Sequence, residues 1–262
     1  MNRLERVLGE SRRAGRKALV VYLCAGDPDL ATTERLVPAL ADAGADVVEL
    51  GVPFSDPLAD GPTIQAASQR ALQSGTSLSS VLRLVERLRA SRCEVPLVLF
   101  GYTNPILRMG LEPFVHRAAL AGADGVLVPD LPLEESGPLR ELAESRGVSV
   151  VLLAAPTTPL ARLSAIGTQT RGFLYFVSVT GVTGARSQLP DDLPEKLAAA
   201  RAATPVPVAV GFGVSTPDQA RALAPHADAV VVGSALVEVL HQGDGNPQQA
   251  LALVRSLAAA LR

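Results

Sequence analysis

Glu49 is the residue whose type and position first suggest chemistry. It lies near the end of a short apolar run, Asp46–Leu50, in which Val47 and Glu49 would share one face of a strand. A carboxyl group buried there has a raised pKa, which is what a general acid–base near neutral pH requires. The alternative is a structural glutamate paired with a nearby arginine or lysine, and the sequence leaves both open.

Asp60 is a second candidate, in a loop of unusual composition. The segment Gly51–Pro62 holds three prolines, and each proline fixes φ, so the loop could aim a side chain without first having to be ordered. Asp60-Gly61 is also ordinary turn chemistry, and Pro62 suits the first turn of a helix. From these residues alone, Asp60 is either catalytic or a turn residue.

Three glycine-bearing segments late in the chain could bind an anion; they are Thr180–Gly184, Gly211–Ser215 and Gly233–Ala235. Glycines let backbone N–H groups approach a phosphate closely, and a helix beginning near Ser234 would add a favourable dipole. Each glycine could also serve only a tight turn. The segment Ser178–Ser187 is expected to act as a lid, so that Thr183 and Gly184 contact a ligand when it closes.

The segments that must position these groups alternate between strand and helix. Apolar runs predict strands over Ala18–Leu23, Asp46–Leu50, Val95–Phe100, Gly125–Val128, Val148–Leu153, Phe173–Val177, Val206–Val210 and Ala229–Val232. Continuous Val/Leu runs are typical of a parallel sheet covered on both faces. Amphipathic stretches predict helices over Ala31–Ala43, Leu78–Ala90, Pro113–Ala121, Glu134–Ser145, Leu160–Gly167 and Pro217–Ala224. The junctions Gly44–Asp46, Gly122–Asp124 and His226–Asp228 each end a helix and precede a strand.

Eight such units average about 33 residues, close to the size of one βα unit. An open doubly wound sheet is the alternative, but no Gly-x-Gly-x-x-Gly follows the first strand. The sequence therefore predicts an α/β fold, a single (β/α)₈ TIM barrel over residues 1–262, with extra N-terminal and loop helices. In such barrels chemistry lies at the C-terminal ends of the strands, which is where the candidate residues fall.

Composition excludes several classes of function. The 262 residues carry a formal net charge of −2, without the basic footprint of a nucleic-acid-binding protein. Neither a signal peptide nor an apolar run of roughly 18–20 residues is present, so we expect a cytoplasmic protein that does not enter membranes. The three histidines lie far apart and the two cysteines form no CxxC pair, so no metal site is expected. Lys17 and Lys196 are the only lysines, and neither lies near the end of a strand, which argues against Schiff-base chemistry.

Several segments, in order along almost the whole chain, share a recognisable pattern: Tyr22 with Ala25–Pro28, Glu49–Gln65, Gly101–Pro105, Pro129–Pro132, Gly181–Gly184 and Gly211–Gly213. The most specific is Glu49–Gln65, because few barrels place such an acidic, proline-rich run after the second strand. Together these segments closely resemble the tryptophan synthase alpha subunit family. Departures are mild: Cys24 stands where threonine is commoner, and Val179 where some members carry arginine.

That family cleaves indole-3-glycerol phosphate to indole and glyceraldehyde 3-phosphate by a retro-aldol step. The resemblance implies that Glu49 protonates the indole carbon and handles the glycerol hydroxyl proton, that Asp60 holds and helps to deprotonate the indole N–H, and that Tyr175 is an active-site tyrosine. It also implies phosphate-binding positions at Gly184, Gly213, Gly233 and Ser234. The implied residues of the indole pocket and lid are Tyr22, Phe100, Leu127, Leu153, Thr183 and Phe212.

Family members act with a beta subunit, so the resemblance implies a partner. An αββα heterotetramer is expected, in which indole passes to the beta subunit for tryptophan biosynthesis. Pyridoxal phosphate is expected only in that partner, with no cofactor in this chain. The implied partner surface includes Pro53, Asp56, Pro57, Asn104 and Pro132. Two alternatives are a stand-alone indole-releasing lyase and a non-catalytic barrel that activates a beta subunit; retained acids and phosphate loops argue against the second.

Overall fold

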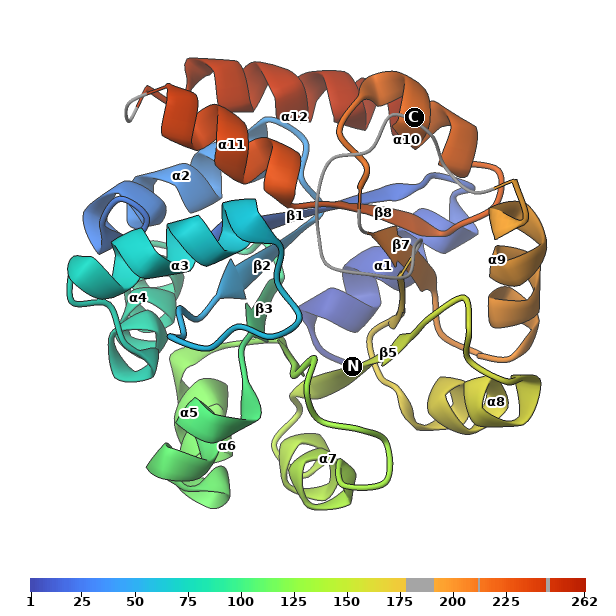
Figure 1. Cartoon of the computed structure of the whole chain (residues 1–262), viewed down its shortest axis with the longest axis horizontal. Coiled ribbons are helices and arrows are strands. Elements are labelled where there is room, and N and C mark those ends of the chain that lie inside the picture. Colours follow the sequence, from blue (N-terminus) through green and yellow to red (C-terminus); the bar gives the residue numbers. More distant parts are fainter. Residues whose placement is uncertain (178–190, 212, 244–245) are drawn as a thin grey trace.

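The predicted barrel is confirmed by a computed structural model, which describes residues 1–177, 191–211, 213–243 and 246–262. Eight parallel strands pair in sequence order, and β8 closes on β1 (Figure 1). They are β1 (Ala18–Cys24), β2 (Val47–Gly51), β3 (Leu97–Phe100), β4 (Gly125–Leu127), β5 (Ser149–Ala154), β6 (Leu174–Val177), β7 (Val208–Gly211) and β8 (Ala229–Val232).

Helices surround the barrel. They are α1 (Arg3–Arg13), α2 (Leu30–Asp42), α3 (Pro62–Gln73), α4 (Leu78–Ala90), α5 (Thr103–Met109), α6 (Leu111–Ala121), α7 (Gly137–Glu144), α8 (Leu160–Gln169), α9 (Leu193–Ala202), α10 (Pro217–Leu223), α11 (Ser234–Gln242) and α12 (Gln248–Leu261). The expected N-terminal helix is α1, whose Leu4 and Leu8 belong to the apolar cluster inside the barrel. In the described ranges no helix is long and apolar enough to cross a bilayer.

Prolines explain where three predicted elements were too long. The strands predicted from Val95 and Val206 start two residues later, after Pro96 and Pro207, which have no N–H to donate to the ladder. The helix predicted from Glu134 begins at Gly137 instead. A start at Glu134 would have put Pro138 at the fifth helical position, where it has no N–H to donate to the Glu134 carbonyl.

Side chains alternate along β2 between two apolar layers. Val47 lies in the cluster inside the barrel, whereas Val48 and Leu50 pack in the layer between the barrel and its helices. Glu49 therefore faces inward with Val47, as the period of two predicted. This register brings the carboxyl group to the C-terminal mouth of the barrel.

Aspartates at the helix-to-strand junctions stabilise the opposite end of the barrel. The carboxylates of Asp46, Asp124 and Asp228 each accept a backbone N–H from the neighbouring strand, at 2.8, 2.9 and 2.9 Å respectively. Before β6 the hydroxyl of Thr170 makes the same contact with a β5 N–H at 3.0 Å. Arginines pair with these carboxylates; Arg89 lies 2.6 Å from Asp124. The junction aspartates thus link adjacent strands, a larger role than the turns predicted from sequence.

Candidate active site

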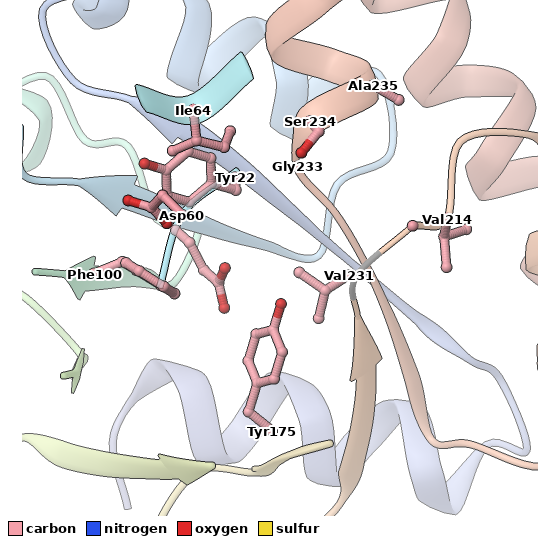
Figure 2. A pocket seen from close by; sticks show the side chains of 12 residues that line it. Tyr22, Asp60, Ile64, Phe100, Tyr175, Val214, Val231, Gly233, Ser234 and Ala235 are labelled. Carbon is pink, nitrogen blue, oxygen red and sulfur yellow. The ribbon is translucent and has the colours of Figure 1, made fainter. Parts of the chain in front are cut away.

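A cavity opens at the C-terminal mouth of the barrel (Figure 2). It collects predicted residues from distant parts of the chain. Its lining consists of Tyr22, Glu49, Asp60, Ile64, Phe100, Tyr175, Gly213, Val214, Val231, Gly233, Ser234 and Ala235. One end therefore holds two carboxyl groups, and the other holds glycines and the start of a helix.

Glu49 is buried without an ion-pair partner among the described residues. Only 1% of its surface is exposed, and within the described ranges its Oε1 accepts no hydrogen bond. Burial raises the pKa of Glu49 from its usual 4.5 to about 8, because the charged form loses its hydration. The arrangement favours the acid–base interpretation over a structural ion pair. At neutral pH the group is protonated, yet able to give up its proton.

Asp60 reaches the same cavity from the β2–α3 loop. Burial raises its pKa to about 6, and a hydrogen bond from Tyr102 partly offsets that rise. The loop is fixed on both sides: the Tyr102 hydroxyl accepts the Ala59 N–H at 3.1 Å, and the Gln65 side chain donates to the Asp60 carbonyl at 2.8 Å. Helix α3 begins at Pro62 as predicted. Asp60 precedes a turn, but its side chain lies in the cavity.

Tyr175 enters from β6, with its hydroxyl pointing into the cavity in Figure 2. Burial raises its pKa well above the usual value, so the phenol stays neutral. Its position depends on Gly211 in the next strand. A Cβ at Gly211 would lie 2.4 Å from the Tyr175 hydroxyl oxygen, closer than any real contact. Gly211 therefore leaves room for the tyrosine. It is also the first residue of Gly211–Ser215, one of the segments that could bind an anion.

The far end of the cavity suits an anion. Helix α11 begins at Ser234, and its N-cap, Gly233, makes no side-chain capping bond. The first N–H groups of α11 have no partner within the helix, and its dipole favours negative charge at this end. Gly213 has φ +91°, a conformation that favours glycine. No basic side chain is among the cavity-lining residues in the described ranges.

Of the other predicted site residues, only some line the cavity among the described residues. Phe100 lines the cavity, whereas Leu127 and Leu153 belong to the surrounding interior cluster without lining it. Their part in an indole pocket stays a prediction. Thr183, Gly184 and Phe212 lie outside the described residues, as does the rest of the expected lid.

The predicted partner residues lie outside the cavity. Pro53 and Asn104 line a separate groove between the β2–α3 loop and α5. Asp56 is exposed and Pro57 half-buried in that loop, while Pro132 borders a third hollow near β5. Two apolar side chains close to the groove in sequence, Leu58 and Leu107, are 84% and 61% exposed.

Sequence reasoning missed Tyr102, although it belongs to a segment already noted for its family resemblance. A polar aromatic residue two positions after a strand was the available signal. It also missed the pairing of Arg70 on α3 with Asp27, two hydrogen bonds of 2.8 and 2.7 Å that join α3 to the loop after β1. Cys24 is a buried thiol. Across the described ranges no group of three or more His, Cys, Asp or Glu could hold a metal ion.

Comparisons with known proteins identify the family to which the chain belongs. A model of the tryptophan synthase alpha chain family matches residues 8–261. The tryptophan synthase alpha chain of Geobacter sulfurreducens is 54% identical over 242 residues, covering 92% of this chain and 91% of that one. That of Pelobacter propionicus is 50% identical, covering 100% and 98%. A crystal structure of the alpha subunit from Legionella pneumophila superposes with a TM-score of 0.92 at 36% identity, covering 100% and 98%. The chain belongs to the tryptophan synthase alpha chain family.

Proposed function

We propose that this chain is a carbon–carbon lyase that cleaves indole-3-glycerol phosphate to indole and glyceraldehyde 3-phosphate, a step of tryptophan biosynthesis. The observation that carries the proposal is Glu49, a lone buried acid with a pKa raised to about 8. It shares its cavity with Asp60 and with the start of α11. Family membership supports the same reaction.

The two acids divide the proton transfers. Glu49, protonated at neutral pH, donates its proton to indole C3, while ionised Asp60 accepts the indole N–H proton, giving the indolenine tautomer. The Glu49 carboxylate then takes the proton of the side-chain hydroxyl next to C3. The bond from C3 to that carbon breaks, its electrons return to the ring, and Asp60 returns the proton to nitrogen. Each acid is regenerated, and positioned transfers of this kind are worth about 10²–10⁴-fold each.

The rest of the cavity orients the substrate. The phosphate would bind the N–H groups at Gly213, Gly233 and Ser234, with Gly184 as a further predicted contact. Binding there is by neutral donors and a helix dipole. Phe100 and Ile64 would then pack on the indole ring beside the acids. Holding the two ends of the substrate in this way fixes the reacting carbon against Glu49.

The proposal extends to a partner. A beta subunit that carries pyridoxal phosphate would receive the indole, in an αββα assembly, and this chain itself would need no cofactor. The groove at Pro53 and Asn104 and the exposed Leu58 and Leu107 support a docking surface there, because exposed apolar side chains are typical of interfaces. We also propose that residues 1–262 form one domain and that the protein acts in the cytoplasm.

Indole release from indole-3-glycerol phosphate, measured with and without added beta subunit, tests the proposal. Strong activation by the partner is expected. High activity of the chain alone would instead indicate a stand-alone lyase. If indole appeared under neither condition while the chain still increased beta-subunit turnover, the barrel would be a non-catalytic activator and the proposed reaction would be wrong.

A further inference from the structure

The hydroxyl of Tyr22 lies at the cavity and has no hydrogen-bond partner among the described residues. Tyr22 lies on β1 directly beside Glu49 of β2 in the sheet register, and it lines the cavity with only 7% of its surface exposed. Throughout the described residues nothing donates a hydrogen bond to this hydroxyl or accepts one from it. A phenol that is more than nine-tenths buried usually has a hydrogen-bond partner. The hydroxyl instead reaches the open cavity, where a ligand or a contact made during turnover can satisfy it.

The ring of Tyr22 is held in one place. Phe100 packs edge-on against it, with ring centroids 5.5 Å apart. A Cβ at Gly51 would lie 2.0 Å from the Tyr22 hydroxyl oxygen, and a Cβ at Gly233 would lie 3.4 Å from the Tyr22 Cβ. The side chain therefore extends from the anion end of the cavity to the acid end. Its hydroxyl is fixed above Gly51, two residues beyond Glu49.

Two carboxyl groups at the acid end could accept from this donor, those of Glu49 and Asp60. Figure 2 shows the Tyr22 hydroxyl directed to the side of the cavity on which the Asp60 carboxylate lies. Burial raises the pKa of Tyr22 well above the usual value, and the nearby Cys24, Asp60, Tyr102 and Glu49 add to the rise electrostatically. The phenol is therefore a neutral donor throughout the working pH range, and the acid ionised at neutral pH nearby is Asp60.

We propose that Tyr22 is a positioning residue for Asp60: when substrate is bound, its hydroxyl donates a hydrogen bond to the Asp60 carboxylate. This inference rests on the proposed function and adds to it. Tyr102 holds the carboxylate from the loop side, and Tyr22 holds it from the cavity side. A carboxylate accepts several hydrogen bonds, so an oxygen still faces the indole N–H. The two phenol hydroxyls together favour the ionised form of Asp60 and hold its carboxylate in one orientation.

Tyr22→Phe tests this, because it removes the hydroxyl and keeps the ring packed on Phe100. We expect kcat for indole release to fall about 10-fold with little change in KM, as for a lost hydrogen bond to a charged group. The acid limb of the kcat profile should move to higher pH, because that profile reports the substrate complex and loss of a donor disfavours ionised Asp60. A purely structural role would lower kcat without moving the limb.

The pH readout is interpretable because the other groups facing Asp60 stay neutral near pH 6. They are Glu49, Tyr22, Tyr102, Tyr175 and Cys24. Ser256→Ala, which deletes an exposed hydroxyl on α12, is a matched control and should leave the profile unchanged. In an Asp60→Asn background, Tyr22→Phe should change kcat less than 2-fold, since Tyr22 acts through Asp60.

The outcomes separate the two proposals. If the wild-type chain with its beta subunit releases no indole, the proposed function fails. If the wild type is active but Tyr22→Phe keeps both its kcat and its acid limb, the role of Tyr22 is wrong and the function stands. An equal loss from Tyr22→Phe in the wild-type and Asp60→Asn backgrounds would also overturn the positioning role.

Discussion

The hydroxyl of Tyr102 lies 3.1 Å from the backbone nitrogen of Ala59 and accepts its hydrogen bond. The same hydroxyl lowers the pKa of Asp60 by hydrogen bonding to its carboxylate. Tyr102 precedes α5, and its ring packs on Phe54 in the loop, with centroids 5.5 Å apart. One side chain thus joins the end of β3 to both the backbone and the carboxylate of the Asp60 loop.

Tyr102→Phe should reduce catalysis without unfolding the loop. The ring contact with Phe54 remains, whereas the hydrogen bonds to Ala59 and Asp60 are lost. Because a hydrogen bond to a charged group is worth about 1.5–3 kcal/mol, kcat/KM for indole-3-glycerol phosphate should fall about 10- to 100-fold. The acid limb of kcat/KM should also move to higher pH. Unchanged kinetics would show that Tyr102 does not position Asp60.

The pH dependence of kcat/KM should be bell-shaped, with limbs near pH 6 and pH 8. Asp60 must be ionised to accept the indole proton, and its pKa is about 6, so activity rises with pH through that value. Glu49 must start protonated, and its pKa is about 8, so activity falls above it. Steady-state rates from pH 5 to 10 measure both limbs. Full activity retained at pH 10 would be incompatible with Glu49 as the proton donor.

Glu49 should also make the folded chain less stable as pH rises. Its pKa is higher in the folded state than the usual 4.5, so the stability it contributes is fully present below pH 4.5 and is lost as pH rises toward 8. The slope is about 1.4 kcal/mol per pH unit in that window. Glu49→Gln removes the titration while keeping the shape of the side chain.

Denaturant unfolding of wild type and Glu49→Gln across pH 4 to 9 checks this. The advantage of the variant should grow steadily with pH and level off above pH 8. A pH-independent difference between the two proteins would mean that Glu49 is not buried as a lone acid.

Asp124 should matter for stability but not for chemistry. Its carboxylate accepts the Leu97 N–H at 2.9 Å and pairs with Arg89 at 2.6 Å, at the end of the barrel away from the cavity. Asp124→Asn should lower the free energy of unfolding by about 3 kcal/mol, because it leaves a partly buried cation unpaired. Turnover per folded molecule should stay near wild type. Asp218→Asn, at an exposed ion pair with Arg221, is the control and should change stability by less than about 1 kcal/mol.

The barrel could be predicted from sequence because its determinants are local. Buried parallel strands are continuous apolar runs, and alternation alone put Glu49 on the inner face of β2. The errors lie at the starts of strands and helices, near residues such as Pro96 and Pro138. There the missing proline N–H has more influence on where the element begins than the hydrophobic pattern has. Junction aspartates such as Asp124 were noticed but interpreted as turn residues, since their strand partners lie in the preceding unit.

The site was only partly predictable, because its remaining determinants are contacts between distant segments. Asp60 could not be told from a turn residue until its side chain was found in the cavity. The contact between Ala59 and Tyr102 joins positions 43 residues apart, and no local pattern specifies it. The closeness of the Tyr22 hydroxyl to Gly51 depends likewise on the register of β1 and β2, in which Tyr22 lies beside Glu49. Raised pKa values follow from burial, which is a property of the whole fold.

Turnover of indole-3-glycerol phosphate by Glu49→Gln, with the beta subunit present, tests the central role of Glu49 most directly. Glutamine keeps the size of the side chain but cannot donate and recover a proton. Indole release should fall at least about 100-fold, while the binding of glycerol 3-phosphate, a probe of the Gly233 and Ser234 end, stays within about 2-fold of wild type. Near-normal indole release by this variant would contradict the assignment of Glu49 as the acid–base group.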